Sequence, residues 1–125
     1  MIVEILKIII PVLLLGSTKA FFDVHEITKG SGIKHFLEWI VWAAAFVVVD
    51  WLFELNMWVL PLQAALSWLW FDALLNSLRG LHIFKVGETW IGDLWLRKLP
   101  NHEFSALLLK VMLIAATLFL YLKCR

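Results

Sequence analysis

Charged residues are scarce in this sequence. Lys and Arg number 11, Asp and Glu number 10, and the four types make up 17% of the 125 residues. Soluble domains average about 25% charged residues. The formal net charge of +1 leaves no basic excess to attract a phosphate backbone, so nucleic acid is not expected as a partner. The single cysteine, Cys124, excludes an internal disulfide.

Familiar catalytic motifs are missing as well. The sequence contains no Gly-rich phosphate loop, no Gly-x-Ser-x-Gly nucleophile elbow and no His-Glu-x-x-His zinc motif. Ser17, Ser67 and Ser77 lie in or beside apolar segments, where small hydroxyl side chains most often support close helix packing. The sequence therefore gives no positive argument for an enzyme, and no bound cofactor is expected.

Long apolar runs dominate what is present. The chain is 62% hydrophobic and its mean hydropathy is +0.87. Four stretches have the length of about 20 residues that a helix needs to cross a bilayer. These stretches are residues 1–22, 36–55, 58–78 and 104–122. We predict one all-α domain, a polytopic integral membrane helical bundle with four transmembrane helices, and membrane lipids as its surroundings.

The basic residues predict how the helices are threaded. Four crossings put the connections after the first and third segments on one side, together with most of the lysines and arginines. Because cytoplasmic loops are enriched in Lys and Arg, these connections are expected in the cytoplasm and both termini outside it. The turn at 56–61 has no basic residue, and Pro61 favours a tight antiparallel hairpin there. The first segment is expected to be retained as an anchor, because Glu4 offsets Lys7 at its start.

The longest connection contains a short amphipathic pattern. Apolar residues recur at helical spacing across residues 89–99, with Thr89 as a candidate N-cap and Pro100 as a stop. We predict an interfacial helix there, lying on the cytoplasmic surface of the membrane. Its apolar side would consist of Trp90, Ile91, Leu94 and Trp95.

Two groups of polar residues fall inside the apolar segments, where ionisable side chains are costly. Asp72, Asn76 and Arg79 share one helical face at i, i+4 and i+7, and this face either fixes helix packing or lines an ion, proton or headgroup path. Asp50 and Glu54 form an acidic pair at i, i+4 near the outer end. Their like charges favour a retained proton, a bound cation or exposure to outer water.

Three further ionisable residues are expected to avoid the membrane interior. Glu4 and Lys7 lie three residues apart near the outer end of the first segment, where they can pair with each other or extend toward the interface. Lys110 lies about two turns into the last segment, and its long stem is expected to carry the ammonium group to the cytoplasmic surface.

Histidines and carboxylates gather at the cytoplasmic ends of the first two segments. His25 and Glu26 end one segment, and His35 and Glu38 open the next, so two helices present four metal-capable ligands to each other. The pattern lacks the Glu-x-x-His repeats of di-iron bundles. Solvated loop ends also collect such residues, so a metal site and simple exposure both remain open.

Three short motifs carry a resemblance to a known group of proteins. They are Lys19-Ala20-x-x-Asp23, Phe71-Asp72-x-x-x-Asn76-x-x-Arg79-Gly80 and Gly87-Glu88-Thr89-x-x-x-Asp93. In these motifs the chain resembles small uncharacterised multi-pass membrane proteins of Bacteroidota and their phages. The resemblance implies a cell inner membrane location and a phage or mobile-element origin, and it transfers no activity.

The leading functional hypothesis is a non-enzymatic membrane protein that forms a homo-oligomer or joins a membrane complex. Its polar face would lie at a helix interface or line a pore, as in a phage holin. The second hypothesis is a membrane-embedded metal- or lipid-dependent enzyme built on His25, Glu26, His35, Glu38 and His102. The third is a membrane scaffold or adaptor that docks a partner through the interfacial helix.

Overall fold

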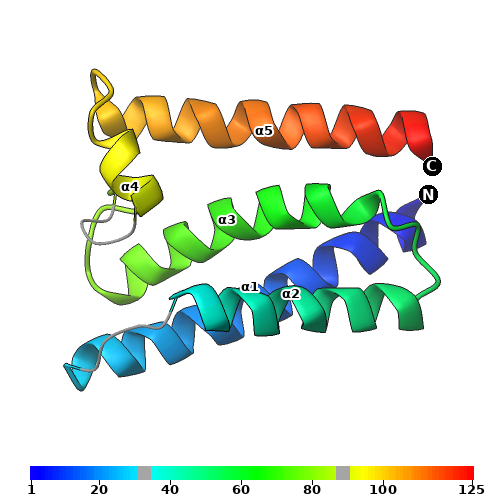
Figure 1. Ribbon diagram of the computed structural model, residues 1–125, viewed down its shortest axis with the longest axis horizontal. Helices are drawn as coiled ribbons and strands as arrows, with labels where there is room; N and C mark the ends of the chain where they lie inside the picture. The colour runs from blue at the N-terminus through cyan, green and yellow to red at the C-terminus, as the bar shows by residue number, and fades with distance from the viewer. Residues whose placement is uncertain (31–34, 87–90) are drawn as a thin grey trace.

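The computed structural model describes residues 1–30, 35–86 and 91–125, and the side chains of 1–30, 37–86 and 93–125. Within these ranges the chain is helical and has no strand, so the predicted all-α class is confirmed. The helices are α1 (Ile2–Thr28), α2 (His35–Leu52), α3 (Val59–Leu78), α4 (Ile91–Leu96) and α5 (His102–Cys124) (Figure 1).

Two of the described helices, α1 and α5, are long and apolar enough to cross a membrane. Only 33% of the most apolar window of α1 and 22% of that of α5 are buried within the protein. A core helix of a soluble protein would be mostly buried, because it is surrounded by other elements. The apolar character of α1 and α5 is therefore directed largely outward.

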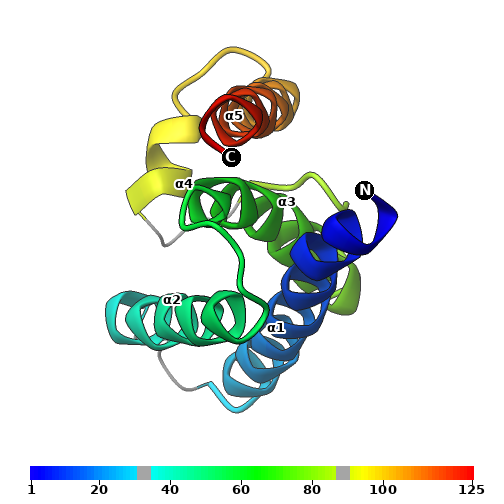
Figure 2. The same cartoon turned by 90° about the vertical axis from the view of Figure 1, so that its right-hand side faces the viewer.

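The helices form an open stack with α3 in the middle. Seen along the helices, α5 lies on one side of α3, and α1 and α2 lie on the other (Figure 2). Helix α1 crosses α3 closely, whereas α5 packs along α3 and touches α4. Both termini and the turn between α2 and α3 lie at one end of the stack, and α4 lies at the opposite end (Figure 1).

Helix α1 is longer than the predicted segment 1–22. It continues to Thr28, which at a rise of about 1.5 Å per residue makes it about 40 Å long. The hydroxyl groups of Thr18 and Thr28 donate to the carbonyl groups four residues earlier, so neither residue interrupts the helix. The chain leaves the helix at Lys29 and turns at Gly30, whose φ of +74° is readily adopted by glycine.

The second and third segments reverse direction as predicted, although α2 makes more contact with α1 than with α3. Helices α2 and α3 run antiparallel and are joined by residues 53–58 (Figure 1). Asn56 stabilises the turn, because its side-chain Oδ1 accepts a hydrogen bond of 3.0 Å from the backbone N–H of Trp58. Pro61 lies in the first turn of α3, where its missing N–H leaves no helical bond unmade. Helix α2 ends at Leu52, short of residue 55, because Glu54 adopts a positive φ of 57°.

Helix α4 is shorter than the predicted interfacial helix. It spans Ile91–Leu96, and the backbone then tightens into turns in which Lys98 and Leu99 donate to carbonyl groups three residues earlier. Leu96 anchors the helix in a small apolar cluster with Val86 and Ala106, against which Trp68 packs. The predicted cap at Thr89 lies outside the described residues.

A glycine allows α1 and α3 to approach closely. A Cβ atom at Gly16 of α1 would lie 3.0 Å from Cδ1 of Trp70 on α3, closer than nearly all real Cβ contacts. The ring of Trp70 is held in place because its Nε1 donates to the hydroxyl of Ser17 at 2.9 Å. A small residue at this position therefore sets the separation of the two helices.

We predict that Gly16→Leu destabilises the protein by about 1–3 kcal/mol, the usual cost of overpacking a close contact. Thermal unfolding of the purified protein in detergent measures this effect. The control is Ala43→Leu on the exposed surface of α2, which introduces a leucine side chain without a clash. Equal midpoints for the two variants would show that the Gly16 contact does not determine the packing of α1 against α3.

Candidate functional site

Several charged and polar side chains are buried beside the apolar core, while many large apolar side chains are exposed. Lys19, Asp23, Asp50 and Gln63 are each at most 2% exposed. Apart from Lys123 near its end, the large exposed residues of α5 are apolar: Phe104, Leu108, Leu109, Val111, Met112, Leu113, Leu118, Phe119, Leu120 and Leu122. In soluble proteins, by contrast, large apolar residues are mostly buried and charged residues are seldom fully buried unless they are paired. The buried polar groups therefore form the candidate site.

Lys19 is the hub of the first polar cluster. Its ammonium group donates to both carboxylate oxygens of Asp23, at 3.0 and 2.9 Å, and to Glu38 of α2 at 3.2 Å. It also lies 5.0 Å from the ring centres of Trp39 on α2 and Phe71 on α3. A single cation thus connects three helices through ion pairs and aromatic faces. Lys19 lies inside α1, within the predicted segment 1–22.

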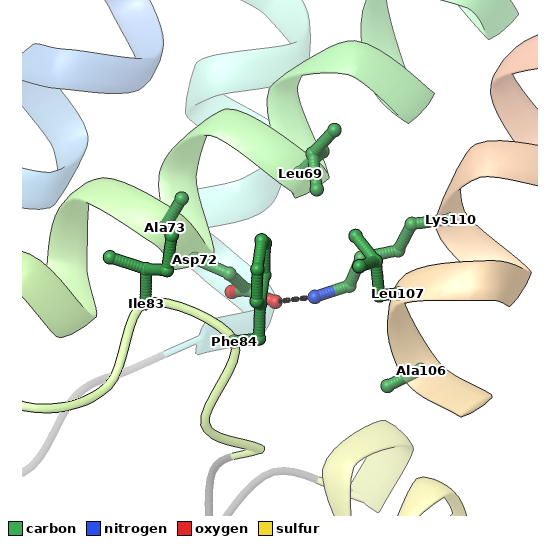
Figure 3. Close-up of a pocket in the computed structure, with 8 residues that line it drawn as sticks. All are labelled: Leu69, Asp72, Ala73, Ile83, Phe84, Ala106, Leu107 and Lys110. Carbon is green, nitrogen blue, oxygen red and sulfur yellow. Dashed lines mark hydrogen bonds and ion pairs between the residues drawn. The ribbon is translucent and has the colours of Figure 1, made fainter. Parts of the chain in front are cut away.

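The second cluster connects α3 to α5. Lys110 of α5 donates to the carboxylate of Asp72 on α3, and its ammonium group lies 5.1 Å from the ring centre of Trp68 (Figure 3). The prediction that Lys110 reaches the cytoplasmic surface is therefore wrong. Its carboxylate partner lies within reach between the helices, and pairing there neutralises both charges.

A small pocket surrounds this ion pair. Side chains from α3, from α5 and from the segment after α3 line it, and Figure 3 shows the dashed contact between Asp72 and Lys110 among them. The lining residues are Leu69, Asp72, Ala73, Ile83, Phe84, Ala106, Leu107 and Lys110. Because most of the lining is apolar, the pair lies in an environment that strengthens its attraction.

The predicted face of Asp72, Asn76 and Arg79 is divided in the structure. Asn76 is buried and donates to the carbonyl groups of Ile83 at 3.2 Å and Lys85 at 2.8 Å, so it fastens the segment after α3. Arg79 follows the last residue of α3 and is exposed. Asp72 and Asn76 therefore serve separate contacts, Asp72 with α5 and Asn76 with the segment after α3.

The predicted acidic pair of Asp50 and Glu54 is not a pair on one helical face. Asp50 is 0% exposed and accepts a hydrogen bond from Nε2 of Gln63 on α3 at 2.9 Å. Glu54 is exposed and lies beyond the end of α2. The prediction fails because the helix ends at Leu52, so the spacing of four residues no longer places both side chains on the same side.

A third set of polar contacts ties the two termini together. Tyr121 of α5 donates to Glu4 of α1 at 2.8 Å, and Arg125 lies 3.2 Å from the same carboxylate. Lys7 donates to the carbonyl group of Phe53 at 3.2 Å. Glu4 and Lys7 therefore find partners on other elements, and the predicted pairing between them is replaced by these contacts.

The candidate metal ligands are not brought together by the described residues. Glu38 is bound to Lys19, while His25 is exposed and Glu26 is half-buried. The side chain of His35 lies outside the described residues. Among the side chains that the structure describes, no three His, Cys, Asp or Glu residues are grouped to hold a metal ion.

The predicted apolar face of the interfacial helix is described in part. Leu94 and Trp95 are exposed, and the ammonium group of Lys98 lies 4.7 Å from the ring centre of Trp95. Trp90 and the side chain of Ile91 lie outside the described residues. An exposed tryptophan beside a lysine is typical of side chains at a membrane surface.

Sequence reasoning missed Gln63 and the partners of both buried lysines. The spacing of Lys19 and Asp23 at i, i+4 was a sufficient signal for their ion pair. The position of Lys110 well inside an apolar segment was a signal that it requires a carboxylate partner. No local pattern, however, links Gln63 to Asp50, because their contact depends on the register of the hairpin.

Comparisons with protein family models, with curated proteins and with solved structures returned no match. The resemblance to multi-pass proteins of Bacteroidota and their phages therefore stays a prediction.

We predict that Asp72→Leu or Lys110→Met alone destabilises the protein by up to about 3 kcal/mol, because each leaves an uncompensated charge between the helices. The double variant Asp72→Leu/Lys110→Met should recover most of this loss, since it removes both charges. Thermal unfolding of all three variants in one detergent measures the coupling. Losses that simply add would show that the two side chains do not stabilise each other.

Proposed function

We propose that this protein is an integral membrane protein of four spanning helices that acts non-enzymatically, as a subunit of a homo-oligomer or of a larger membrane complex. The observation that carries this proposal is that ionisable side chains such as Lys19 and Asp50 are buried, while many large apolar side chains are exposed. In water such a surface would promote aggregation. In a bilayer the same surface faces acyl chains, while the buried polar groups find partners within the protein.

The arrangement of the helices supports four crossings. Four long helices connect two ends of the molecule, with both termini at the same end (Figure 1). Helices α2 and α3, of 18 and 20 residues, would span about 27 and 30 Å, close to the thickness of the hydrocarbon core. Helix α3 lies in the middle of the stack, where it contacts both α1 and α5.

The contacts of the polar residues favour a structural role over a conduction path. Asp72 is neutralised by Lys110, and Asn76 is occupied by two backbone carbonyl groups. Lys19 likewise has two carboxylate partners. Side chains engaged in this way hold helices together and do not present free ligands to a moving ion. Glu38 is likewise engaged by Lys19, which argues against a metal-dependent enzyme that uses Glu38 as a ligand.

Assembly is supported by the open side of α5. This helix packs against α3 and leaves most of its circumference uncovered (Figure 2). Ala115 and Ala116 are exposed in its central turns. Small side chains allow the backbone of another helix to approach closely within a membrane. A second copy or another membrane protein can therefore pack on this side of α5.

Cysteine labelling tests the four crossings. In intact cells, a membrane-impermeant maleimide is expected to label Cys124 and, in a Cys124→Ser background, Met57→Cys in the turn between α2 and α3. Lys29→Cys and Lys85→Cys, in the same background, are expected to react only after the membrane is opened. The proposed threading would be overturned if, in intact cells, the reagent labelled both Cys124 of the wild type and the new cysteine of the Lys85→Cys variant.

The number of chains per particle tests assembly. Native mass spectrometry of protein extracted with its surrounding lipid is expected to show more than one chain, or this chain with another membrane protein. Ala116→Trp places a bulky ring on the open side of α5 and should shift the distribution toward single chains, whereas Val41→Trp on exposed α2 serves as the control. Single chains at every concentration, with no partner, would contradict the assembly part of the proposal.

A further inference from the structure

The contact between Asp50 and Gln63 leaves an unusual pair of atoms unsatisfied. One oxygen of Asp50 accepts the amide N–H of Gln63 at 2.9 Å. The second oxygen of Asp50, Oδ2, and the amide oxygen of Gln63, Oε1, are both buried and have no hydrogen-bond partner among the described residues. Both atoms are acceptors when Asp50 is ionised, so neither can satisfy the other.

One added proton on Asp50 would give both unsatisfied oxygens a hydrogen bond. A carboxylic acid has one donor and one acceptor side by side, and so does a primary amide. The two groups can therefore form a closed ring in which the amide N–H donates to Oδ1 and the acid O–H on Oδ2 donates to Oε1. The 2.9 Å bond between Gln63 and Asp50 is already one half of this ring.

The charged side chains described around Asp50 do not give an ionised carboxylate a counter-charge. From α1, Lys7 is engaged by the carbonyl group of Phe53 at 3.2 Å. From the end of α2, Glu54 is exposed and has the same sign of charge as an ionised Asp50. From α3, the buried polar side chains of this region are Gln63 and Ser67, and both are uncharged. Asp50 thus differs from Asp23 and Asp72, which each have a lysine.

We propose that Asp50 and Gln63 form a proton-binding site between α2 and α3, in which Asp50 is a neutral carboxylic acid at neutral pH. An ionised carboxylate at this place would be fully desolvated without a counter-charge, which is far costlier than a hydrogen-bonded neutral acid. Release of the proton therefore requires α2 and α3 to part or water to enter. The site goes beyond the proposed function, because it depends on this contact alone and not on assembly.

A metal ion is the competing occupant. The hydroxyl of Ser67, one turn further along α3, is the third buried oxygen without a partner in the described residues. Together with Asp50 and Gln63 it would offer three oxygen ligands, whereas hard cations such as Ca²⁺ and Mg²⁺ take about six. The existing hydrogen bond between Asp50 and Gln63 favours the proton, because a proton completes a ring that is half formed.

Infrared spectroscopy of the full-length protein in lipid vesicles tests the proposal directly. At neutral pH the wild type is expected to show the C=O stretching band of a protonated carboxylic acid, and Asp50→Asn should lose it. Asp72→Asn, which removes a carboxylate paired with lysine, should keep the band. The proposal is overturned if the wild type shows no acid band that Asp50→Asn removes. It is also overturned if replacing choline by sodium or calcium in the buffer abolishes the band.

Unfolding supplies a second readout, because asparagine imitates the neutral acid. In Asp50→Asn the amide N–H of the new side chain would replace the acid O–H in the ring, so this variant should match the thermal midpoint of the wild type at acidic pH, below about pH 4, where Asp50 is protonated in the folded and the unfolded protein alike. With rising pH the wild type should become less stable than the variant, because unfolding allows aspartate, but not asparagine, to ionise. A variant that fails to fold, or that loses as much stability as Asp72→Asn, would show that Asp50 is charged and would refute the proposal.

Discussion

The cost of an unpaired charge between apolar helices is the constraint on which this structure depends. An ionised side chain in a low-dielectric interior must meet an opposite charge or be neutralised by a proton. Lys19 and Lys110 meet that requirement with carboxylates on their own or on neighbouring helices. Because each partner is reached in only one arrangement, the ion pairs select one packing of helices whose apolar surfaces alone would specify little.

The polar contacts are spread along the stack and join different helices. At the end that contains the termini, Glu4 accepts a hydrogen bond from the hydroxyl of Tyr121 and so connects α1 with α5. Near the same end, beside the turn between the two helices, Asp50 and Gln63 connect α2 with α3. Toward the other end, Lys19 holds α1, α2 and α3 together. Every long helix is therefore tied to another by at least one polar contact, which compensates for the open shape.

The sequence was sufficient to predict the helices but not their mutual contacts. Apolar runs of about 20 residues located the four long helices, because apolar runs of this length are typical of helices and too long for strands. The ends were less accurate: nothing in residues 23–28 of α1 signals a continuing helix, and Glu54 adopts a left-handed conformation that its identity does not require. The site was predicted least well, since Asp72 and Lys110 are 38 residues apart and meet only after α3 and α5 have packed.

The three aspartates on the inner helical surfaces illustrate how different neutralising groups lead to different properties. Asp23 and Asp72 are compensated by lysines, so each carboxylate has an opposite charge within the protein. Asp50 has an amide in place of a cation, and its compensation depends on a proton that can leave. A change of pH therefore acts on the contact between Asp50 and Gln63, whereas Lys19 and Lys110 join α1, α2, α3 and α5 through ion pairs and an aromatic contact. The end of α2 beside Gln63 is thus the place where the proposed proton site can alter helix packing.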